Sequence, residues 1–599
     1  MSEIYDHTPS TALHRLNQTL LQIDPYILPP YPNLSIVSGP TSPPLQELTL
    51  SQLLHQQVQR HARNTAVIIP WTGARWTYQK LWDVSTLLAR ALLQAGVQPK
   101  DRIGIMSGNC EKYIALFFAI VRVGAICVTL NNTYTDVEVE FALRHTKCRI
   151  LFTTPTIARF DNVPLLKRLV EEDSMKRLPD LKCICLIRGQ YAGCTTYEEF
   201  RQGADAVPEH ILDVFDKVVD AYEVANLQFT SGSTGKPKAA MLTHHNLVNN
   251  STFIAHRLCL TPADTLCCPP PLFHCFGLTL GLLACLTHGA SIVFPSESFD
   301  AAACMHAISS EQCTALHGVP AMMEDILSIP RPASWTSKLR TGIVAGSPVP
   351  KYLMERMVNE LGMTDFTSSY GLTEASPTVF NAHTTDSLHA RLTTVGAVMP
   401  HASVKIVDRR GGIVPIGVRG ELCVAGYQVC AGYWENEDKT NEVMERDAEG
   451  VLWLRTGDEA VLDWEGRCKI TGRFKDIVIR VLLRIDTDRV ELGGENIYPL
   501  EIEERLVAHP SISRAIVVGV SHSRYVEVPA AFLSHEPGTE KPNLAEVQSW
   551  VRKVLGRHKA PVYIFWLGED CEAEVPLTGS GKIRKFVLRD VAEEILRQR

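Results

Sequence analysis

The sequence has no excess of positive charge, and this excludes one large class of partners. Its 599 residues include 59 Lys and Arg against 66 Asp and Glu, which gives a net charge of −7 at pH 7 and an isoelectric point near 6.3. The lysines are scattered along the chain and do not cluster with aromatic residues. Because nucleic-acid-binding proteins gather basic side chains on one face, we expect no nucleic-acid partner.

The sequence also has no pattern typical of a targeting signal or of a membrane-spanning segment. Residues 1–16 have no basic stretch followed by an apolar core, and residues 596–599 do not form a peroxisomal Ser-Lys-Leu ending. The most apolar stretch, 113–130, is interrupted by Arg122 and Gly124 and then alternates, as in a buried helix that leads into a strand. We therefore expect no transmembrane segment and a cytoplasmic location.

The 17 cysteines lack the regular spacing of a zinc site or of a small secreted disulfide framework. They are interpreted as reduced thiols of an intracellular protein. Cys183 and Cys185 alternate within an apolar run, which favours burial in a strand over metal ligation. No metal site made of cysteine is predicted.

A chain of this length with 45% hydrophobic residues is too long for one core and predicts several subdomains. Helix and strand patterns alternate: Thr77 can begin a helix that Gly96 ends, and a strand follows at 102–106. This alternation indicates an α/β fold. Residues 1–45 are proline-rich and are interpreted as a loosely attached N-terminal extension.

Beyond residue 475 the pattern contains fewer elements and predicts a small α+β domain. The expected strands lie at 516–520 and 530–533, and the expected helices at 500–509, 544–554 and 586–597.

The sequence TSGSTGKPK at residues 230–238 follows an apolar run and has the composition of a phosphate-binding loop. Glycine lets backbone N–H groups approach phosphate oxygens, hydroxyls add donors, and lysine adds positive charge. The residues that supply these groups are Thr230, Ser231, Gly232, Ser233, Thr234, Gly235, Lys236 and Lys238. Because Pro237 follows Lys236, this is not the usual P-loop, and another segment must hold the magnesium. Spacing alone leaves a flexible surface turn as the alternative.

A helix is predicted directly after this loop. Thr243 can cap a helix that continues through residues 247–253. The phosphates are therefore expected near a strand-to-helix turn, where the helix dipole favours anions.

Further blocks follow the loop in order, and together they carry a family resemblance. They are PLFHCFG (271–277), HGVPAM (317–322), SYGLTEASP (369–377), GELCVAG (420–426), WLRTGDEA (453–460), GRFKD (472–476), GGENIYPLEIE (493–503) and PLTGSGKIRK (576–585). The chain resembles the adenylate-forming superfamily, which contains acyl-CoA synthetases, nonribosomal-peptide adenylation domains and luciferases. Blocks such as GELCVAGYQVCAGYW are most similar to those of medium-chain and related fatty-acid or aryl-acid CoA ligases.

The resemblance implies a two-domain α/β enzyme. A large domain of α/β subdomains with a small β-barrel would span residues 46–474, and a small mobile α+β lid domain would span 475–599. The implied reaction has two halves: a carboxylate attacks the α-phosphate of ATP to give an acyl-adenylate, and the thiol of CoA then displaces AMP. ATP, Mg²⁺ and CoA are therefore the implied cofactor and co-substrates.

The same resemblance assigns residues to the nucleotide. Glu374 would bind Mg²⁺ and Thr373 the phosphate, whereas an isolated Thr-Glu pair would more often be a helix cap. Tyr370 would flank adenine, and Asp458 would accept hydrogen bonds from both ribose hydroxyls with help from Arg473. The implied nucleotide-binding set also contains Gly346, Ser347, Pro348, Ser369 and Gly371.

Three further groups are implied outside the nucleotide site. Lys582 would stabilise the negative charge that develops in the first half-reaction. Phe273 and His274 match the acyl-pocket region, although a core histidine is the alternative for His274. Lys475 would be the hinge of the small domain. Gly493 and Gly494 would line the tunnel for the pantetheine arm.

The chain departs from the family pattern at three places. Residues 481–492 stand between GRFKDIVIR and GGENIYP, where relatives continue directly; a tolerated longer loop, a block to CoA and a gene-model error are the alternatives. Val526 and Ala239 each replace a usual glycine. If either position needs a positive φ, the side chain costs about 1 kcal/mol or more.

The sequence thus predicts an ATP-dependent acid:CoA ligase that acts on an apolar fatty or aryl acid. One alternative makes acyl-AMP for a carrier protein or downstream acyltransferase, and another is a noncatalytic nucleotide-binding homologue. An amino-acid adenylation domain is disfavoured, because those have Asp after the first Phe where this chain has His274.

Overall fold

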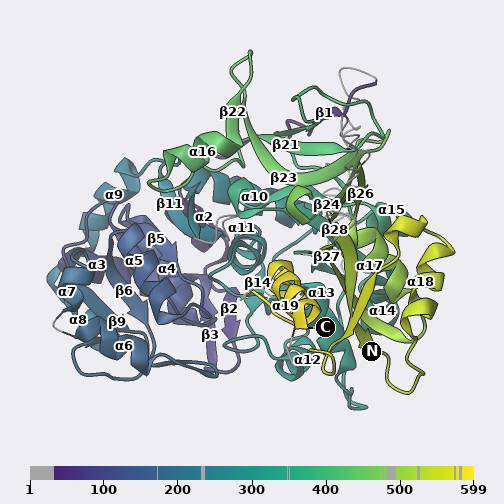
Figure 1. Cartoon of the computed structure of the whole chain (residues 1–599). Helices are drawn as coiled ribbons and strands as arrows, with labels where there is room; N and C mark the ends of the chain where they lie inside the picture. The colour runs from purple at the N-terminus through teal and green to yellow at the C-terminus, as the bar shows by residue number, and fades with distance from the viewer. Residues whose placement is uncertain are drawn as a thin grey trace, which may run out of the picture. The chain divides into compact units, whose positions relative to one another are not determined.

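The computed structural model describes residues 33–171, 173–230, 237–346, 349, 351–476, 478–481, 494–522, 527–571, 575–578 and 583–598 (Figure 1). The chain forms two compact units. The first contains Met1–Lys405, Cys423–Arg455 and Asp463–Cys468, and the second contains Ile406–Leu422, Thr456–Leu462 and Lys469–Arg599. The boundaries expected at residues 45 and 474 stay predictions.

The first unit contains a seven-stranded sheet of order β10-β9-β6-β4-β5-β11-β12. All neighbours are parallel except β11 and β12, which form an antiparallel pair. Its central strands are continuous apolar runs, as expected where helices cover a parallel sheet, and α4 packs against β5 and α5 against β6. The strands are β4 (Arg102–Ile105), β5 (Ile126–Thr129), β6 (Cys148–Thr153), β9 (Cys183–Leu186), β10 (Thr195–Thr196), β11 (Val224–Thr230) and β12 (Lys238–Thr243). The helices of this region are α3 (Tyr78–Gln94), α4 (Glu111–Arg122), α5 (Asp136–His145), α6 (Val163–Val170), α8 (Tyr197–Gln202), α9 (Leu212–Val218) and α10 (His244–Arg257).

A nine-stranded sheet of order β19-β18-β17-β16-β15-β13-β14-β2-β3 forms the rest of the first unit's α/β core. The six strands from β17 to β2 are parallel, and β3, β18 and β19 add antiparallel edges. The strands are β2 (Thr65–Ile69), β3 (Ala74–Thr77), β13 (Thr265–Cys267), β14 (Ser291–Val293), β15 (Ala315–Leu316), β16 (Thr341–Val344), β17 (Asp365–Gly371), β18 (Thr378–Asn381) and β19 (Ala397–Val398). The helices are α2 (Leu50–His61), the π-helix η3 (Phe276–Leu283), α11 (Ala284–Thr287), α12 (Ala301–Ser310), α13 (Pro320–Ser328), α14 (Lys351–Leu361) and α15 (Leu388–Thr393).

A third sheet, a half-barrel, has the order β1-β20-β21-β23-β22, with β24 pairing to β23. The chain passes between the two units within this sheet. Its strands are β1 (Ile36–Ser38), β20 (Ala402–Val407), β21 (Gly420–Gly426), β22 (Met444–Arg446), β23 (Leu452–Leu462) and β24 (Cys468–Arg473).

The C-terminal part of the second unit is a three-stranded sheet between helices, which confirms the predicted α+β character. Alternate residues of β27 face opposite sides: Ile516 and Val518 pack in one apolar cluster with Leu588 of α19, and Val517 packs in another with Ile502 of α17. The elements are β27 (Ile512–Ser521), β28 (Glu527–His535), β29 (Tyr563–Trp566), α17 (Pro499–Val507), α18 (Leu544–Arg552) and α19 (Lys585–Gln598).

Several predicted elements of the first unit are confirmed. Thr77 caps α3 and accepts a hydrogen bond from the N–H of Lys80, and Gly96 follows the helix with φ of +75°. The apolar stretch 113–130 contains α4 and then β5. In the described part of the chain, no helix is both long and apolar enough to cross a bilayer.

The predicted strand-to-helix turn at the phosphate loop is wrong. Thr230 and Lys238 are paired partners at the ends of β11 and β12, which are antiparallel, so the chain continues after the motif as a strand and not as a helix. Helix α10 begins after β12, where Thr243 pairs with Val224 at the opposite end of the same strands. The N-terminus of α10 therefore lies at the end of β12 opposite to Lys238, and residues 231–236 lie outside the described residues.

One departure from the family pattern lies in a described strand, and the other two lie wholly or mostly outside the described residues. Ala239 lies in β12 and has no positive φ, so its side chain causes no backbone strain. The first additional residue, Val481, ends β25 (Val478–Val481), which pairs antiparallel with β26 (Gly494–Ile497) from Val478–Ile497 to Val481–Gly494. Residues 482–493 and Val526 lie outside the described residues.

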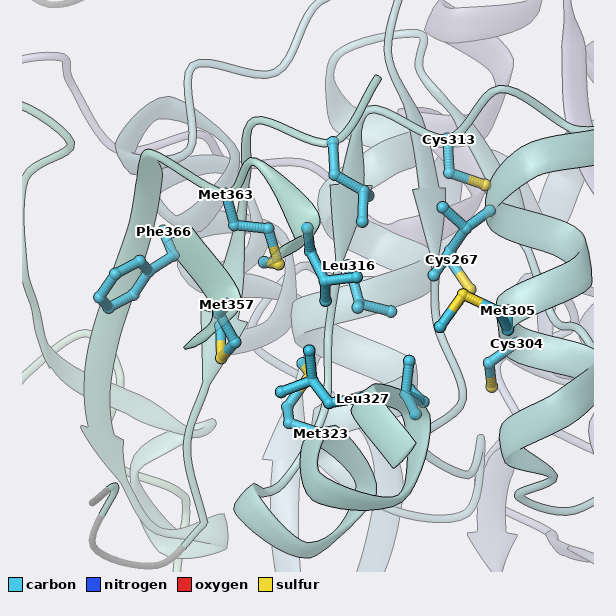
Figure 2. Close-up of a cluster of buried hydrophobic side chains, with 14 of the residues drawn as sticks. Cys267, Cys304, Met305, Cys313, Leu316, Met323, Leu327, Met357, Met363 and Phe366 are labelled. Atoms are coloured by element: carbon cyan, nitrogen blue, oxygen red, sulfur yellow. The ribbon is translucent and has the colours of Figure 1, made fainter. Parts of the chain in front are cut away.

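Cysteine and methionine fill much of the core of the nine-stranded sheet. Figure 2 shows Cys267, Cys304 and Cys313 close to Met305 on one side, and Met357, Met363 and Phe366 on the other. All 17 cysteines lie in the described residues, none forms a disulfide and 15 are buried, so the thiols act mainly as small apolar packing groups. Cys183 and Cys185 lie in β9, as predicted.

Truncation of one of these side chains tests the packing. Met357 on α14 is fully buried in the cluster, so Met357→Ala is expected to lower the free energy of unfolding by about 2–5 kcal/mol. Val137→Ala is the control, because Val137 is 64% exposed on α5 and its loss should change stability by less than about 0.5 kcal/mol. Urea unfolding of both variants measures the difference, and equal shifts would contradict the assignment.

Candidate active site

The candidate site lies at one edge of the nine-stranded sheet. Parallel strands end at the same edge, so the segments that follow them gather there although they are distant in sequence. His274 follows β13, Gly346 follows β16, and β17 ends in Tyr370 and Gly371. Val344 pairs with Ser368 across β16 and β17, which brings two of these segments side by side.

A tight turn after β17 presents Thr373 and Glu374. The N–H of Leu372 donates to the carbonyl of Pro377 at 3.0 Å, which closes the turn. A Cβ atom at Gly371 would lie 2.1 Å from that carbonyl oxygen, so glycine is required there. Both Thr373 and Glu374 remain half-buried.

The Glu374 carboxylate joins the turn to two other segments. Its Oε1 accepts hydrogen bonds from Thr230 Oγ1 at 3.2 Å and from the Tyr433 hydroxyl at 2.8 Å. Its backbone carbonyl accepts from the N–H of Cys430 at 2.9 Å. The first residue of the phosphate loop therefore contacts the carboxylate that the sequence assigned to the metal.

Tyr433 is a site residue that the sequence reasoning did not identify. Its ring lies 4.9 Å from the ammonium of Lys238, a cation–π contact, while its hydroxyl donates to Glu374. Burial, the charge of Glu374 and their hydrogen bond raise the pKa of Tyr433 well above its ordinary value, so the hydroxyl remains a donor at any physiological pH. Its one signal in the sequence is its place at the end of GELCVAGYQVCAGYW.

The predicted acyl-pocket segment is adjacent to this turn. Nδ1 of His274 accepts the N–H of Phe276 at 3.1 Å, so the neutral ring carries its proton on Nε2. The Cys275 thiol lies 3.8 Å from the same Nδ1 and 3.9 Å from Thr373 Oγ1, and it links the two motifs. Phe273 is largely buried beside them.

The residues predicted for adenine lie on the strands that lead to the turn. The Tyr370 ring centroid is 6.4 Å from that of Phe380, and the Ser369 hydroxyl donates to the Phe380 carbonyl at 3.1 Å. Gly346 is exposed with φ of +94°, a conformation that favours glycine.

The residues predicted for the ribose pair with each other in the second unit. Arg473 Nε lies 2.9 Å from Oδ1 of Asp458, whose side chain is 4% exposed against 47% for the arginine. Gly457 has φ of +70° within β23, and this local kink precedes Asp458. The adjacent Glu459 accepts hydrogen bonds from Thr471 and Tyr498, which fixes this part of the strand.

Several predicted site residues fall on positions that the structure does not describe. These are Ser231, Gly232, Ser233, Thr234, Gly235, Lys236, Ser347, Pro348, Gly493 and Lys582. The described neighbours of Lys582 form an antiparallel bridge between Leu577 and Ile583. The backbone of Lys475 lies in a 3₁₀ turn, and Gly494 begins β26.

The side chains present fit a magnesium–nucleotide complex. Mg²⁺ in nucleotide enzymes usually binds one or two carboxylates together with substrate phosphates and water. Glu374 supplies one carboxylate beside the phosphate loop, and the two hydroxyl donors both bind its Oε1; among the described residues none donates to Oε2. The described residues contain no group of three or more His, Cys, Asp or Glu side chains that could hold a metal by themselves.

Removal of the Tyr433 hydroxyl tests this geometry. A hydrogen bond to a charged group contributes about 1.5–3 kcal/mol, so Tyr433→Phe is expected to lower kcat/KM for ATP by about 10-fold or more. Pyrophosphate release at varied ATP measures the effect. Tyr222→Phe is the matched control, because Tyr222 also donates to a carboxylate, Glu47, but is 59% exposed. Equal losses in both variants would contradict the assignment.

Comparison with known proteins agrees with the fold and the motifs. The model of the AMP-binding enzyme family matches residues 54–434, and that of the AMP-binding enzyme C-terminal domain matches residues 501–582. The chain is 56% identical to the acyl-CoA ligase sidI of Beauveria bassiana over 97% of this chain and 98% of that protein. It is 36% identical to the mitochondrial medium-chain acyl-CoA ligase ACSF2 of Danio rerio, over 94% and 91% of the two chains.

Solved structures share the fold. The anthranilate CoA ligase AuaEII in complex with anthranoyl-AMP superposes with a TM-score of 0.78 at 22% identity, and the match covers 92% of this chain and 99% of that one. The chain therefore belongs to the AMP-binding enzyme family and, within it, is an acyl-CoA ligase.

Proposed function

We propose that this acyl-CoA ligase activates an apolar fatty or aryl acid and that Glu374 is the centre of its adenylation site. The observation that carries the proposal is the hydrogen bond between Thr230 of the phosphate loop and Glu374 of the YGLTE motif. Two motifs 144 residues apart in sequence contribute to one polar cluster, as a shared triphosphate ligand requires.

In the first half-reaction, a carboxylate oxygen of the acid attacks the α-phosphorus of ATP. The bond between the α-phosphorus and the bridging oxygen breaks, and pyrophosphate leaves. The phosphate loop and Lys238 hold the phosphates, while Glu374 holds the magnesium that neutralises phosphate charge when bound. Thr373, next to the acyl-pocket segment, donates to the α-phosphate where the two substrates meet.

Asp458, Arg473 and Lys582 are assigned to the same half-reaction. The Asp458 carboxylate accepts hydrogen bonds from the ribose hydroxyls, and its ion pair with Arg473 orients it. Lys582 stabilises the charge that develops on the phosphate and carboxylate oxygens.

In the second half-reaction, the thiolate of CoA attacks the acyl carbon, and AMP leaves. Lys475 is the hinge at which the small domain turns between the two steps, and Gly493 and Gly494 leave room for the pantetheine arm. Phe273 and His274 line the acyl pocket, where the Nε2–H of the neutral imidazole donates to the substrate carboxylate or acyl oxygen.

A product assay tests the proposed function. Purified protein is incubated with Mg-ATP, CoA and a panel of fatty and aryl acids, and short polar acids serve for comparison. We expect pyrophosphate release and acyl-CoA formation with the fatty or aryl acids. Pyrophosphate without thioester would indicate transfer to another acceptor, such as a carrier protein. The absence of both products with every acid of the panel would overturn the proposal.

A substitution of Lys582 distinguishes the two half-reactions, because this lysine is assigned to the first one alone. Because its charge acts on the first transition state, Lys582→Ala is expected to abolish adenylate formation and to spare thioester formation from supplied acyl-AMP. Lys553→Ala, at an exposed lysine after α18, is the control and should change neither step. Equal loss of both half-reactions in Lys582→Ala would refute the assignment.

A further inference from the structure

Helix α10 buries three asparagines, and each uses its side-chain amide to hold backbone that is distant in sequence or in the fold. Asn246 is 5% exposed, and Asn249 and Asn250 are fully buried. A buried amide must find partners for both its N–H₂ group and its carbonyl oxygen, so each of these side chains fixes the groups that it binds. The sequence NLVNN at 246–250 therefore places three hydrogen-bonding amide side chains on the buried helix α10.

Asn250 holds the chain just after the Thr373–Glu374 turn. Its Oδ1 accepts the N–H of Thr378 at 3.1 Å, and its Nδ2 donates to the carbonyl of the same residue at 2.9 Å. Nδ2 also donates to the Tyr427 hydroxyl at 3.1 Å. Thr378 is four residues beyond Glu374 and begins β18, so this double hydrogen bond anchors one end of the turn.

Asn246 holds the segment that faces the carboxylate. Its Nδ2 donates to the carbonyls of Tyr427 at 2.5 Å and of Val429 at 3.3 Å. The next residue, Cys430, donates its N–H to the Glu374 carbonyl, and Tyr433 donates its hydroxyl to the Glu374 carboxylate. The oxygen of Asn246 serves a different purpose, because it caps α10 by accepting the N–H of Thr243 at 2.8 Å.

We propose that Asn246 and Asn250 are positioning residues that set the Glu374 carboxylate for a divalent cation bound with ATP. Asn250 fixes the turn that carries Glu374, and Asn246 fixes the segment that holds both its carbonyl and its carboxylate. Tyr427 joins the two, since its carbonyl binds one asparagine and its hydroxyl the other. This inference rests on the proposed role of Glu374 as the metal ligand.

Asn249 provides an internal comparison on the same helix. Its Oδ1 accepts the N–H of Gln46 at 2.7 Å, and its Nδ2 donates to the carbonyls of Gln46 and His245, both at 2.9 Å. It is as buried as Asn250 and equally well hydrogen-bonded, but its partners do not flank Glu374.

The same substitution at the three positions separates positioning from general stability. In Asn246→Asp, Asn249→Asp and Asn250→Asp, the acceptor oxygen is kept and the N–H₂ donor is lost. Asn246→Asp also keeps the helix cap and adds negative charge in the first turn of α10, where the helix dipole favours it. This variant therefore tests the proposal even if Asn250→Asp fails to fold.

The measurement is the affinity of Mn²⁺ for the protein–ATP complex in the absence of acid, so that no turnover is involved. Free Mn²⁺ is followed by its electron paramagnetic resonance signal, and thermal unfolding of each variant is recorded in parallel. Loss of a residue that orients a metal ligand weakens metal binding by about 10–100-fold, so we expect at least about 10-fold weaker Mn²⁺ binding in Asn246→Asp and Asn250→Asp. Asn249→Asp should bind Mn²⁺ like the unmodified chain despite a similar loss of thermal stability.

Glu374→Gln distinguishes failure of this inference from failure of the proposed function. If Glu374→Gln binds Mn²⁺ normally, the metal role of Glu374 is wrong. If Glu374→Gln weakens binding while Asn246→Asp and Asn250→Asp do not, the metal role holds and the positioning role is overturned. Equal weakening in all three asparagine variants would also overturn it, because the effect would then follow stability and not the position of Glu374.

Discussion

The site depends on the rule that neighbouring parallel strands end at the same edge of their sheet. In the nine-stranded sheet, this constraint brings the segments after β13, β16 and β17 together, although they are separated by up to about a hundred residues. The seven-stranded sheet adds the phosphate loop through the end of β11, and Thr230 makes the contact to Glu374. Disruption of either parallel sheet would therefore separate Thr230 from Glu374.

A second constraint explains why the surroundings of Glu374 are so polar. Where β17 ends and β18 begins, backbone N–H and C=O groups are buried outside regular sheet pairing, and they need side-chain partners. The side chain of Asn250 binds both the N–H and the carbonyl of Thr378, and that of Asn246 binds the carbonyls of Tyr427 and Val429. The same hydrogen bonds that satisfy the backbone also fix the acidic side chain, so stability and geometry of the site have one cause.

The departure at residues 481–492 begins with the last residue of β25, and the antiparallel strand β26 begins at Gly494. Residues 478–481 pair in register with residues 494–497, and Val478 and Ile497 are fully buried in the core of the small domain. Val481 lies within this pairing, and residues 482–492 lie outside the described residues. Ala239 is tolerated, because a β-strand does not need the positive φ for which glycine is reserved.

The sequence by itself determined the α/β class and the family, and it named the candidate site residues, because motifs such as TSGSTGKPK and YGLTE place particular side chains at fixed short spacings. It also determined local elements such as α3, whose cap and terminal glycine act within a few residues. The tertiary structure decided what sequence spacing does not encode. It paired Thr230 with Lys238 across two antiparallel strands, at the end opposite to the start of α10, and it identified Tyr433, Asn246 and Asn250 as partners of the Glu374 region. These contacts join segments from 59 to about 180 residues apart, and only the pairing of strands and the burial of polar groups determine which of them meet.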